Sequence, residues 1–93
     1  MENNTNIVSF SCGSFHTIAV DKEGFAYALG NNDVGQLGIP GDRVSKNFKK
    51  INNFMIADIT KVFCLGECSF FVNSECEMFY CGKHSYKSKK RFI

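Results

Sequence analysis

Three short strand-like segments follow one another between residues 8 and 38, and only tight turns separate them. In the first, Val8, Phe10 and Cys12 alternate with serines, which is the period-two pattern of a half-buried strand. The second, 16–20, is rich in β-branched residues, and the third, 25–29, places three large side chains on one face and two alanines on the other. Segments this short with such brief connections predict an antiparallel, all-β sheet.

The turns between these segments carry their own signals. The second and third segments are joined by Asp21-Lys-Glu-Gly24. An aspartate that bonds nearby backbone, followed by a glycine where positive φ is needed, indicates a short hairpin. Gly13 and Ser14 make a similar break between the first and second segments. Further turn residues follow the third segment: Gly30, Gly35, Gln36 and Gly38.

The order of these motifs resembles one repeat of the regulator of chromosome condensation family. Its pattern is Gly-x-x-His, a hairpin glycine, an aromatic-x-x-Gly step and a Gly-Gln-Leu-Gly loop. Members of that family fold as seven-bladed β-propellers, so the resemblance implies one four-stranded antiparallel β-propeller blade, whose outer strand we expect at 48–51. The resemblance assigns a structural role in the repeat to Gly13, His16, Gly24, Gly30, Gly35, Gln36 and Gly38.

A weaker copy of the first part begins near Ile59. We align Gly66 with Gly13, with one residue lost opposite Phe15, so that Cys68 stands against His16. This alignment predicts strands at 61–65, 69–73 and 78–81. A spacing of about 50 residues suits a propeller blade.

The second copy departs from the pattern at three places. It has Cys68 where the first has His16 and Cys76 where the first has Gly24, and no Gly-Gln-Leu-Gly follows Gly82. We therefore expect an incomplete propeller, with one full blade and a partial second one. The predicted divisions are a disordered N-terminus (1–6), a first repeat (7–58), a degenerate partial repeat (59–82) and a basic C-terminal tail (83–93).

Composition narrows the class of protein. A chain of 93 residues with 44% hydrophobic residues is long enough for one small packed domain. Its net charge of +2 does not mark the whole chain as a nucleic-acid binder. No apolar run resembles a membrane span or a signal peptide, so a cytoplasmic or nuclear location with reduced cysteines is expected.

The residues with catalytic or metal-binding potential do not form a known constellation. His16 has no Gly-x-Ser-x-Gly or similar nucleophile motif near it. The glycines match neither a Walker loop nor a dinucleotide fingerprint. Four cysteines and His84 lack the paired C-x₂-C spacing of zinc sites: Cys64, Cys68, Cys76 and Cys81. The sequence therefore predicts no enzyme activity, no catalytic residue, no metal and no cofactor.

The last eleven residues hold five cations and no acidic residue: Lys83, Lys87, Lys89, Lys90 and Arg91. Such a segment could contact an anionic partner such as phosphate, an acidic lipid or an import receptor. A solvated chain end is the simpler interpretation, which we favour.

The function expected from these observations is a non-enzymatic protein–protein interaction module, as a fragment or truncated copy of a larger propeller. One or two blades cannot close a ring, so an open blade face should remain for another protein, further blades or a second copy. The alternative is part of a guanine-nucleotide exchange factor for a small GTPase. A third hypothesis is a chromatin- or RNA-associated peptide that acts through the basic tail.

Overall fold

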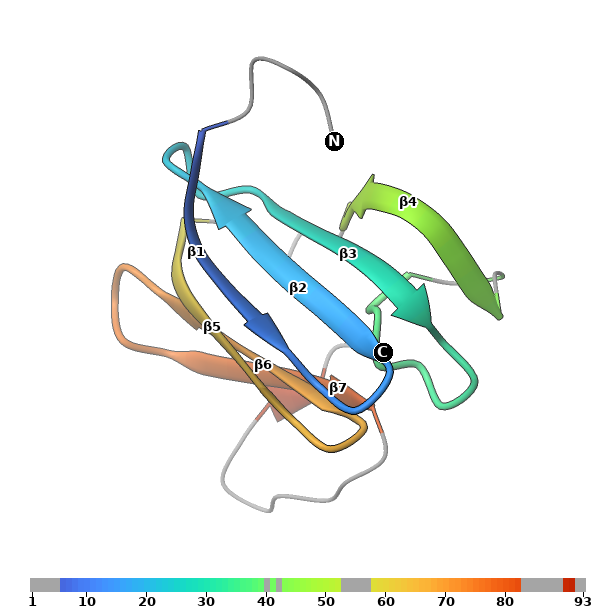
Figure 1. Cartoon of the computed structure of the whole chain (residues 1–93). Coiled ribbons are helices and arrows are strands. Elements are labelled where there is room, and N and C mark those ends of the chain that lie inside the picture. The colour runs from blue at the N-terminus through green and yellow to red at the C-terminus, as the bar shows by residue number, and fades with distance from the viewer. Residues whose placement is uncertain (1–5, 40, 42, 53–57, 83–89, 92–93) are drawn as a thin grey trace.

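The computed structural model describes residues 6–39, 41, 43–52, 58–82 and 90–91, and these form two stacked sheets (Figure 1). The first sheet is antiparallel, with strands in chain order: β1 (Ile7–Cys12), β2 (His16–Asp21), β3 (Ala26–Asn31) and β4 (Val44–Lys50). The second follows the same order: β5 (Ile59–Leu65), β6 (Cys68–Asn73), β7 (Met78–Gly82) and β8 (Lys90–Arg91). The all-β prediction is confirmed.

Two strands differ most from the sequence prediction. The outer strand β4 begins at Val44 and ends before Ile51, whereas we expected 48–51. The sequence pattern did not predict its full length, because an edge strand with several lysines does not alternate between apolar and polar residues. In the second sheet, the two-residue strand β8 pairs with β7 in parallel, inside the segment predicted as a tail.

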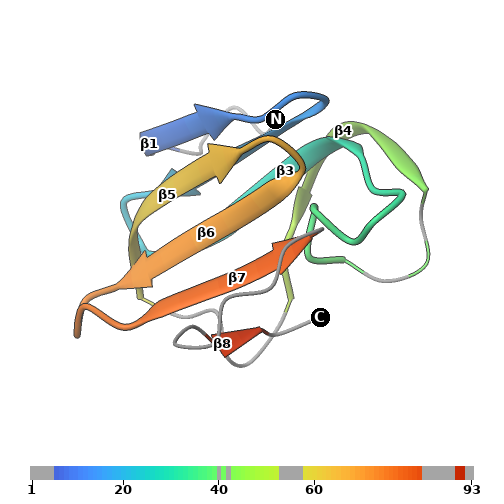
Figure 2. The ribbon, with the colours of Figure 1, turned by 90° about the horizontal axis from the view of Figure 1, so that it is seen from below.

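The core lies between the two sheets, and each sheet contributes side chains of a different size. The first sheet supplies mostly small or branched ones: Ile18, Val20, Ala26 and Ala28. The second supplies larger or softer ones: Val62, Phe71, Phe79 and Cys81. Figure 2 shows β5 and β6 lying across the first sheet. Small residues opposite large ones let the two backbones approach while the space between them is filled.

The alternation in β1 is as predicted, but its apolar side is not the buried one. Val8 and Phe10 are 60% and 68% exposed and point away from the second sheet. The serines face the second sheet instead, where Ser11 Oγ accepts a hydrogen bond from the Cys64 N–H at 2.9 Å. The period of a strand fixes which residues share a face, but the neighbouring sheet decides which face is covered.

The two sheets share one register, which corrects the expected match of Gly66 with Gly13. Ile7 pairs with Asp21 and Ile59 with Asn73, so both partners move by 52 residues (59 − 7 and 73 − 21). The same shift relates the remaining pairs of β1–β2 to β5–β6 and of β2–β3 to β6–β7. No residue is lost between the copies, and Leu65 occupies the position of Gly13.

The second hairpin of each sheet also has the same geometry. Asp21 Oδ1 accepts hydrogen bonds from the N–H groups of Glu23 and Phe25, at 2.9 and 3.0 Å. Asn73 Oδ1 does the same for Glu75 and Glu77, at 3.0 and 2.9 Å. In both turns the fourth residue has positive φ, +89° at Gly24 and +65° at Cys76. The loss of this glycine has therefore not changed the turn.

Candidate functional site

His16 lies at the junction of the two sheets. It begins β2, is 4% exposed, and its Nε2 lies 2.8 Å from Ser69 Oγ on β6. Ser69 Oγ in turn donates its single hydrogen to the Gln36 carbonyl at 2.5 Å. Ser69 must then accept from His16, which places the imidazole proton on Nε2.

This arrangement is a structural link and not a nucleophile–base pair. A base that activates serine must have an unprotonated nitrogen facing the hydroxyl, whereas here that nitrogen carries the proton. His16 Nδ1 is buried beside Gly13 and has no hydrogen-bond partner among the described residues, so no carboxylate orients the ring. Burial lowers the pKa of His16, which keeps the ring neutral at pH 7.

Gln36 connects the Gly-Gln-Leu-Gly loop to the second sheet. Its side chain is held within the loop: Oε1 accepts from the Val34 N–H at 3.0 Å, and Nε2 donates to Asn31 Oδ1 at 3.2 Å. The backbone carbonyl points outward and accepts hydrogen bonds from Ser69 Oγ and Cys81 Sγ. The adjacent Leu37 is fully buried in the core.

The loop glycines make this reach possible. Gly35 and Gly38 have φ values of +80° and +73°, a region that side chains disfavour. The Asn32 side chain, which precedes both glycines, accepts a hydrogen bond from the Leu37 N–H and donates one to the Ile39 carbonyl, at 3.0 and 2.8 Å. These bonds hold the loop in a conformation that directs the Gln36 carbonyl toward the second sheet.

A second link lies along β1 and β5. Besides the bond from the Cys64 N–H to Ser11 Oγ, Cys64 Sγ donates to the Ser11 carbonyl at 3.3 Å. The Ser14 N–H donates to the Gly66 carbonyl at 2.8 Å. Burial raises the pKa of Cys64 to about 11, so this side chain stays a neutral thiol.

Three of the motif glycines lie where backbone or ring atoms leave no room for a side chain. A Cβ on Gly13 would overlap the His16 ring. One on Gly24 would come within 2.8 Å of Asp58 Cα, and one on Gly30, whose φ is +116°, within 2.5 Å of the Phe15 carbonyl oxygen. The structure thus brings Gly13, Gly30, His16 and Gln36 to one junction, while Gly24 shapes the opposite hairpin.

Ser11 and Ser69 make hydrogen bonds across this junction, and the sequence analysis assigned a role to neither of them. A usable signal existed for Ser69, because the aligned residue of the first copy, Thr17, also bears a hydroxyl. Ser11 gave no comparable signal, since its counterpart under the true register is Phe63.

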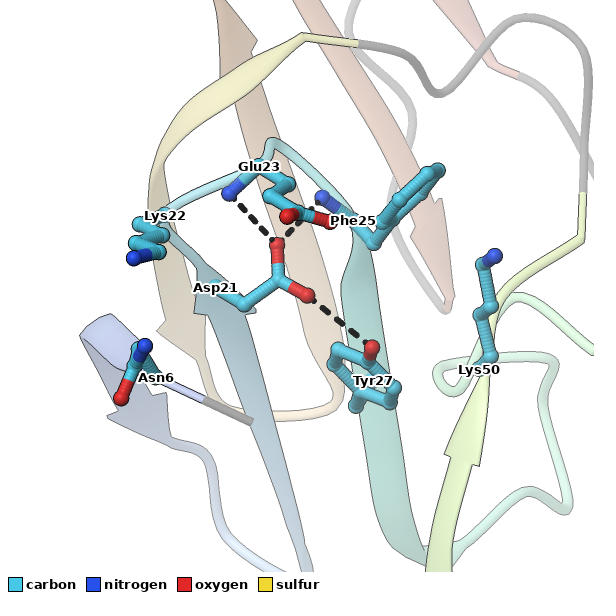
Figure 3. A pocket seen from close by; sticks show the side chains of 7 residues that line it. All are labelled: Asn6, Asp21, Lys22, Glu23, Phe25, Tyr27 and Lys50. Carbon is cyan, nitrogen blue, oxygen red and sulfur yellow. Dashed lines mark hydrogen bonds between the residues drawn. The ribbon is translucent and has the colours of Figure 1, made fainter. Parts of the chain in front are cut away.

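A hollow of about 220 Å³ lies on the outer side of the first sheet at the β2–β3 hairpin, and Figure 3 shows the side chains that line it. Asp21 at its centre is fully engaged, since Oδ1 accepts two backbone N–H groups and Oδ2 accepts the Tyr27 hydroxyl at 3.0 Å. At the rim, Lys50 Nζ lies 3.7 Å from the centre of the Phe25 ring. These contacts stabilise the hairpin.

Only two of the five basic residues that were predicted to contact an anionic partner are among the residues that the structure describes. Lys83, Lys87 and Lys89 lie outside the described residues, and Lys90 and Arg91 are described as strand β8 only. Within the described ranges, no three His, Cys, Asp or Glu side chains are grouped as a metal site would need. No helix in that part of the chain has the length and apolar character to cross a membrane.

The outer faces of the two sheets differ. On the first, Val8, Phe10 and Phe25 remain exposed. On the second, Phe63 and Leu65 are exposed along β5, but most of the face is a buried cluster of Cys68, Phe70 and Tyr80 with Met78 packed against it. Exposed apolar side chains thus remain on the outer face of each sheet.

Residues 7–36 match the family model of the regulator of chromosome condensation (RCC1) repeat. These residues form an RCC1 repeat. The mouse RCC1-like G exchanging factor-like protein is 30% identical over 83 residues, which cover 84% of this chain and 18% of that protein. Protein FMP25, mitochondrial, of Saccharomyces cerevisiae is 53% identical over 34 residues, covering 37% of this chain and 6% of that protein.

Solved RCC1-type structures show the same fold. The crystal structure of human WBSCR16 superposes with a TM-score of 0.83 at 22% identity, over 92% of this chain and 22% of that one. Yeast Prp20p, whose structure was described with its binding to Gsp1p and histones, gives a TM-score of 0.77 at 20% identity, over 88% and 19%. The chain thus spans less than a quarter of these relatives. Its two sheets superpose on a part of each propeller.

Proposed function

We propose that the two sheets are adjacent blades of a larger RCC1-type propeller, and that the chain is a non-enzymatic protein-interaction module. The contact that supports this most is the chain of hydrogen bonds from His16 through Ser69 to the Gln36 carbonyl. In this chain the histidine and the serine, which could otherwise act in catalysis, bind the two sheets together. On this proposal, 7–58 and 59–82 are the two repeat units. The Gly13, His16, Gly30 and Gln36 set holds them together.

The proposed interaction surface is the outer face of the first sheet. Val8 and Phe10 lie there on β1, both more than half exposed, and exposed apolar side chains gathered on one face favour a contact site. The aromatic and hydroxyl groups of Tyr27 and Thr17 belong to the same face. A protein partner, including further blades, fits this chemistry better than a small molecule does.

A photo-crosslinking side chain in place of Phe10 tests this surface in the full chain, expressed in the cells from which it comes. We expect a discrete protein adduct at position 10. The matched control places the same group at Glu75, on the exposed tip of the β6–β7 hairpin. No adduct at position 10, or the same adduct at both positions, would contradict the proposal.

A second candidate is a contribution to guanine-nucleotide exchange on a small GTPase. The observation that favours it is the 30% identity with the mouse G exchanging factor-like protein over most of this chain. Exchange requires tighter binding of the nucleotide-free GTPase than of the loaded form, which needs no bond chemistry. Release of a labelled nucleotide should be accelerated by micromolar chain, and an unchanged rate would remove this candidate for the chain alone.

A further inference from the structure

The hairpin after β2 carries a charge that its turn does not need. The matching hairpin after β6 has Asn73, and the neutral Oδ1 of this side chain accepts the two backbone N–H groups that hold the turn. In the first hairpin, Asp21 makes the same two bonds and adds a second oxygen with a negative charge. Asp21 is 7% exposed, and no ion pair joins it to a lysine in the part of the chain that the structure describes. A carboxylate buried in this way favours a cationic partner.

Aromatic side chains line the hollow beside this carboxylate (Figure 3). They are Phe25 and Tyr27, and Lys50 is the cross-strand partner of Tyr27. Because Lys50 Nζ lies 3.7 Å from the centre of the Phe25 ring, the face of this ring already attracts an ammonium group. The Tyr27 hydroxyl donates its single hydrogen to Asp21 Oδ2, so it has no hydrogen to offer an anion.

The second hairpin has the same turn without these groups. At the shift of 52 residues, Glu77 stands in the place of Phe25, and Phe79 stands in the place of Tyr27. Phe79 is buried in the core between the sheets. Of the two hairpins, only the first therefore combines a carboxylate, a phenyl ring and a phenol hydroxyl around a hollow.

The charge around the hollow also favours a basic partner. Five of the nine acidic residues of the chain lie in the two hairpins or just before β5: Asp21, Glu23, Asp58, Glu75 and Glu77. Backbone bonds hold these segments together at one end of the molecule. The Ile59 N–H donates to the Gly24 carbonyl at 3.1 Å, and the Ser74 N–H donates to the Asp58 carbonyl at 2.9 Å. The two lysines that line the hollow offset only part of this charge, and carboxylates gathered at one end attract cationic segments.

We propose that this hollow binds the ammonium group of a lysine side chain from a basic peptide segment of another protein. The ammonium group packs on the Phe25 ring and donates a hydrogen bond to the Asp21 carboxylate. Lys50, which lies over that ring in the free chain, is an internal competitor that the incoming lysine displaces. The site is separate from the exposed apolar side chains of Val8 and Phe10, and it goes beyond the interaction surface proposed there.

A titration of the full chain with two capped tripeptides tests the site. The probe is acetyl-Gly-Lys-Gly-amide, and its control is the same peptide with the lysine acetylated, which removes the positive charge. Because the Glu23 and Phe25 N–H groups bond to Asp21, their amide resonances should shift with the probe and reach saturation. The acetylated peptide should leave them unchanged at the same ionic strength. Equal shifts with both peptides, or no shift with either, would overturn the proposal.

Two matched substitutions locate the charge. Asp21→Asn keeps a side chain that holds this turn, as Asn73 does in the second hairpin, and should weaken binding of the probe about tenfold or more. Asn73→Asp makes the reverse change in the second hairpin and should alter the affinity less than about twofold. Phe25→Leu, which leaves the turn residues intact, should weaken binding about threefold. An unchanged affinity in both Asp21→Asn and Phe25→Leu would refute the site.

The Lys50→Met variant distinguishes a cation site from an anion site. Removal of the internal competitor should strengthen binding of the lysine probe about threefold. Weaker binding in this variant would mean that Lys50 helps to hold the ligand, and would contradict the proposal. These results are separable from the crosslinking at position 10, because a lost adduct there with intact probe binding would refute the proposed surface alone. An adduct there without probe binding would refute the lysine site alone.

Discussion

The two hairpins that follow β2 and β6 reach one geometry from different sequences. In the first, Gly24 supplies the positive φ at no steric cost; in the second, Cys76 holds φ +65° against its own side chain. What they share is an Asx residue, Asp21 or Asn73, whose Oδ1 accepts two backbone N–H groups. The turn is therefore specified by this side chain and the strand register. Gly24 removes the strain of positive φ and also leaves room for the backbone of Asp58.

The largest effect is expected where the first hairpin meets the linker. Gly24→Val places a β-branched side chain at φ +89° and brings Cβ within 2.8 Å of Asp58 Cα. We expect a loss of about 3 kcal/mol or more in the free energy of unfolding. Urea unfolding followed by circular dichroism measures this loss, and an unchanged midpoint would mean that the turn is not built as described. Cys76→Val is the matched variant, and its smaller loss should reflect a turn that already carries a side chain.

The next effect distinguishes the junction from the open face. Ser69→Ala leaves the Gln36 carbonyl and the His16 Nε2–H without their shared partner inside the core, which should cost about 2 kcal/mol. Its counterpart Thr17→Val, on the outer face, should cost less than about 0.5 kcal/mol in the two-sheet chain. Thermal melts of both variants measure the difference, and equal losses would count against the assignment of the two faces.

A stabilising change should come from the second hairpin. Cys76→Gly removes the strain of a side chain at positive φ, which is worth about 1 kcal/mol. The flexible glycine also raises the entropy of the unfolded chain, so the net gain should be smaller than that. Comparison of urea midpoints detects it, and a clear loss of stability would show that the Cys76 side chain makes a contact the turn needs.

The smallest effect is the pH dependence from His16. Burial lowers its pKa below the ordinary value of 6.5, so near pH 6 the unfolded chain binds more protons than the folded one. Stability should therefore fall as pH is lowered from 7.5 through 6.5, and His16→Gln should flatten that slope. The slope of unfolding free energy against pH, compared between the parent and this variant, checks the sign. An identical slope in both would assign the dependence to another group.

The sequence predicted the features that depend on local residues, and it missed those that depend on packing between the two sheets. The residues Asp21-Lys-Glu-Gly24 predict a tight turn, and the strands on either side follow from the alternation of residues and from β propensity. The direction in which Phe10 points, by contrast, depends on a second sheet 50 residues later in the chain. The single-residue gap assumed opposite Phe15 came from matching two glycines by type, whereas strand pairing puts Leu65 at the place of Gly13.

The junction was only half predictable for the same reason. His16 and Gln36 belong to a recognisable motif, so they could be named before their contacts were known. Ser69 and Ser11 are ordinary hydroxyls in alternating strands, and only the stacking of the sheets gives them partners. The strand β8 had no signal at all, because two basic residues carry no period.

The most direct test of stacked, register-matched blades is a double-mutant cycle on His16→Ala and Ser69→Ala in the full chain, read by urea unfolding. Residues 53 apart in sequence should show a coupling of about 1 kcal/mol or more if they meet across the junction. Losses that add within about 0.5 kcal/mol would mean that the two side chains are independent, and the stacked arrangement of the sheets would be contradicted.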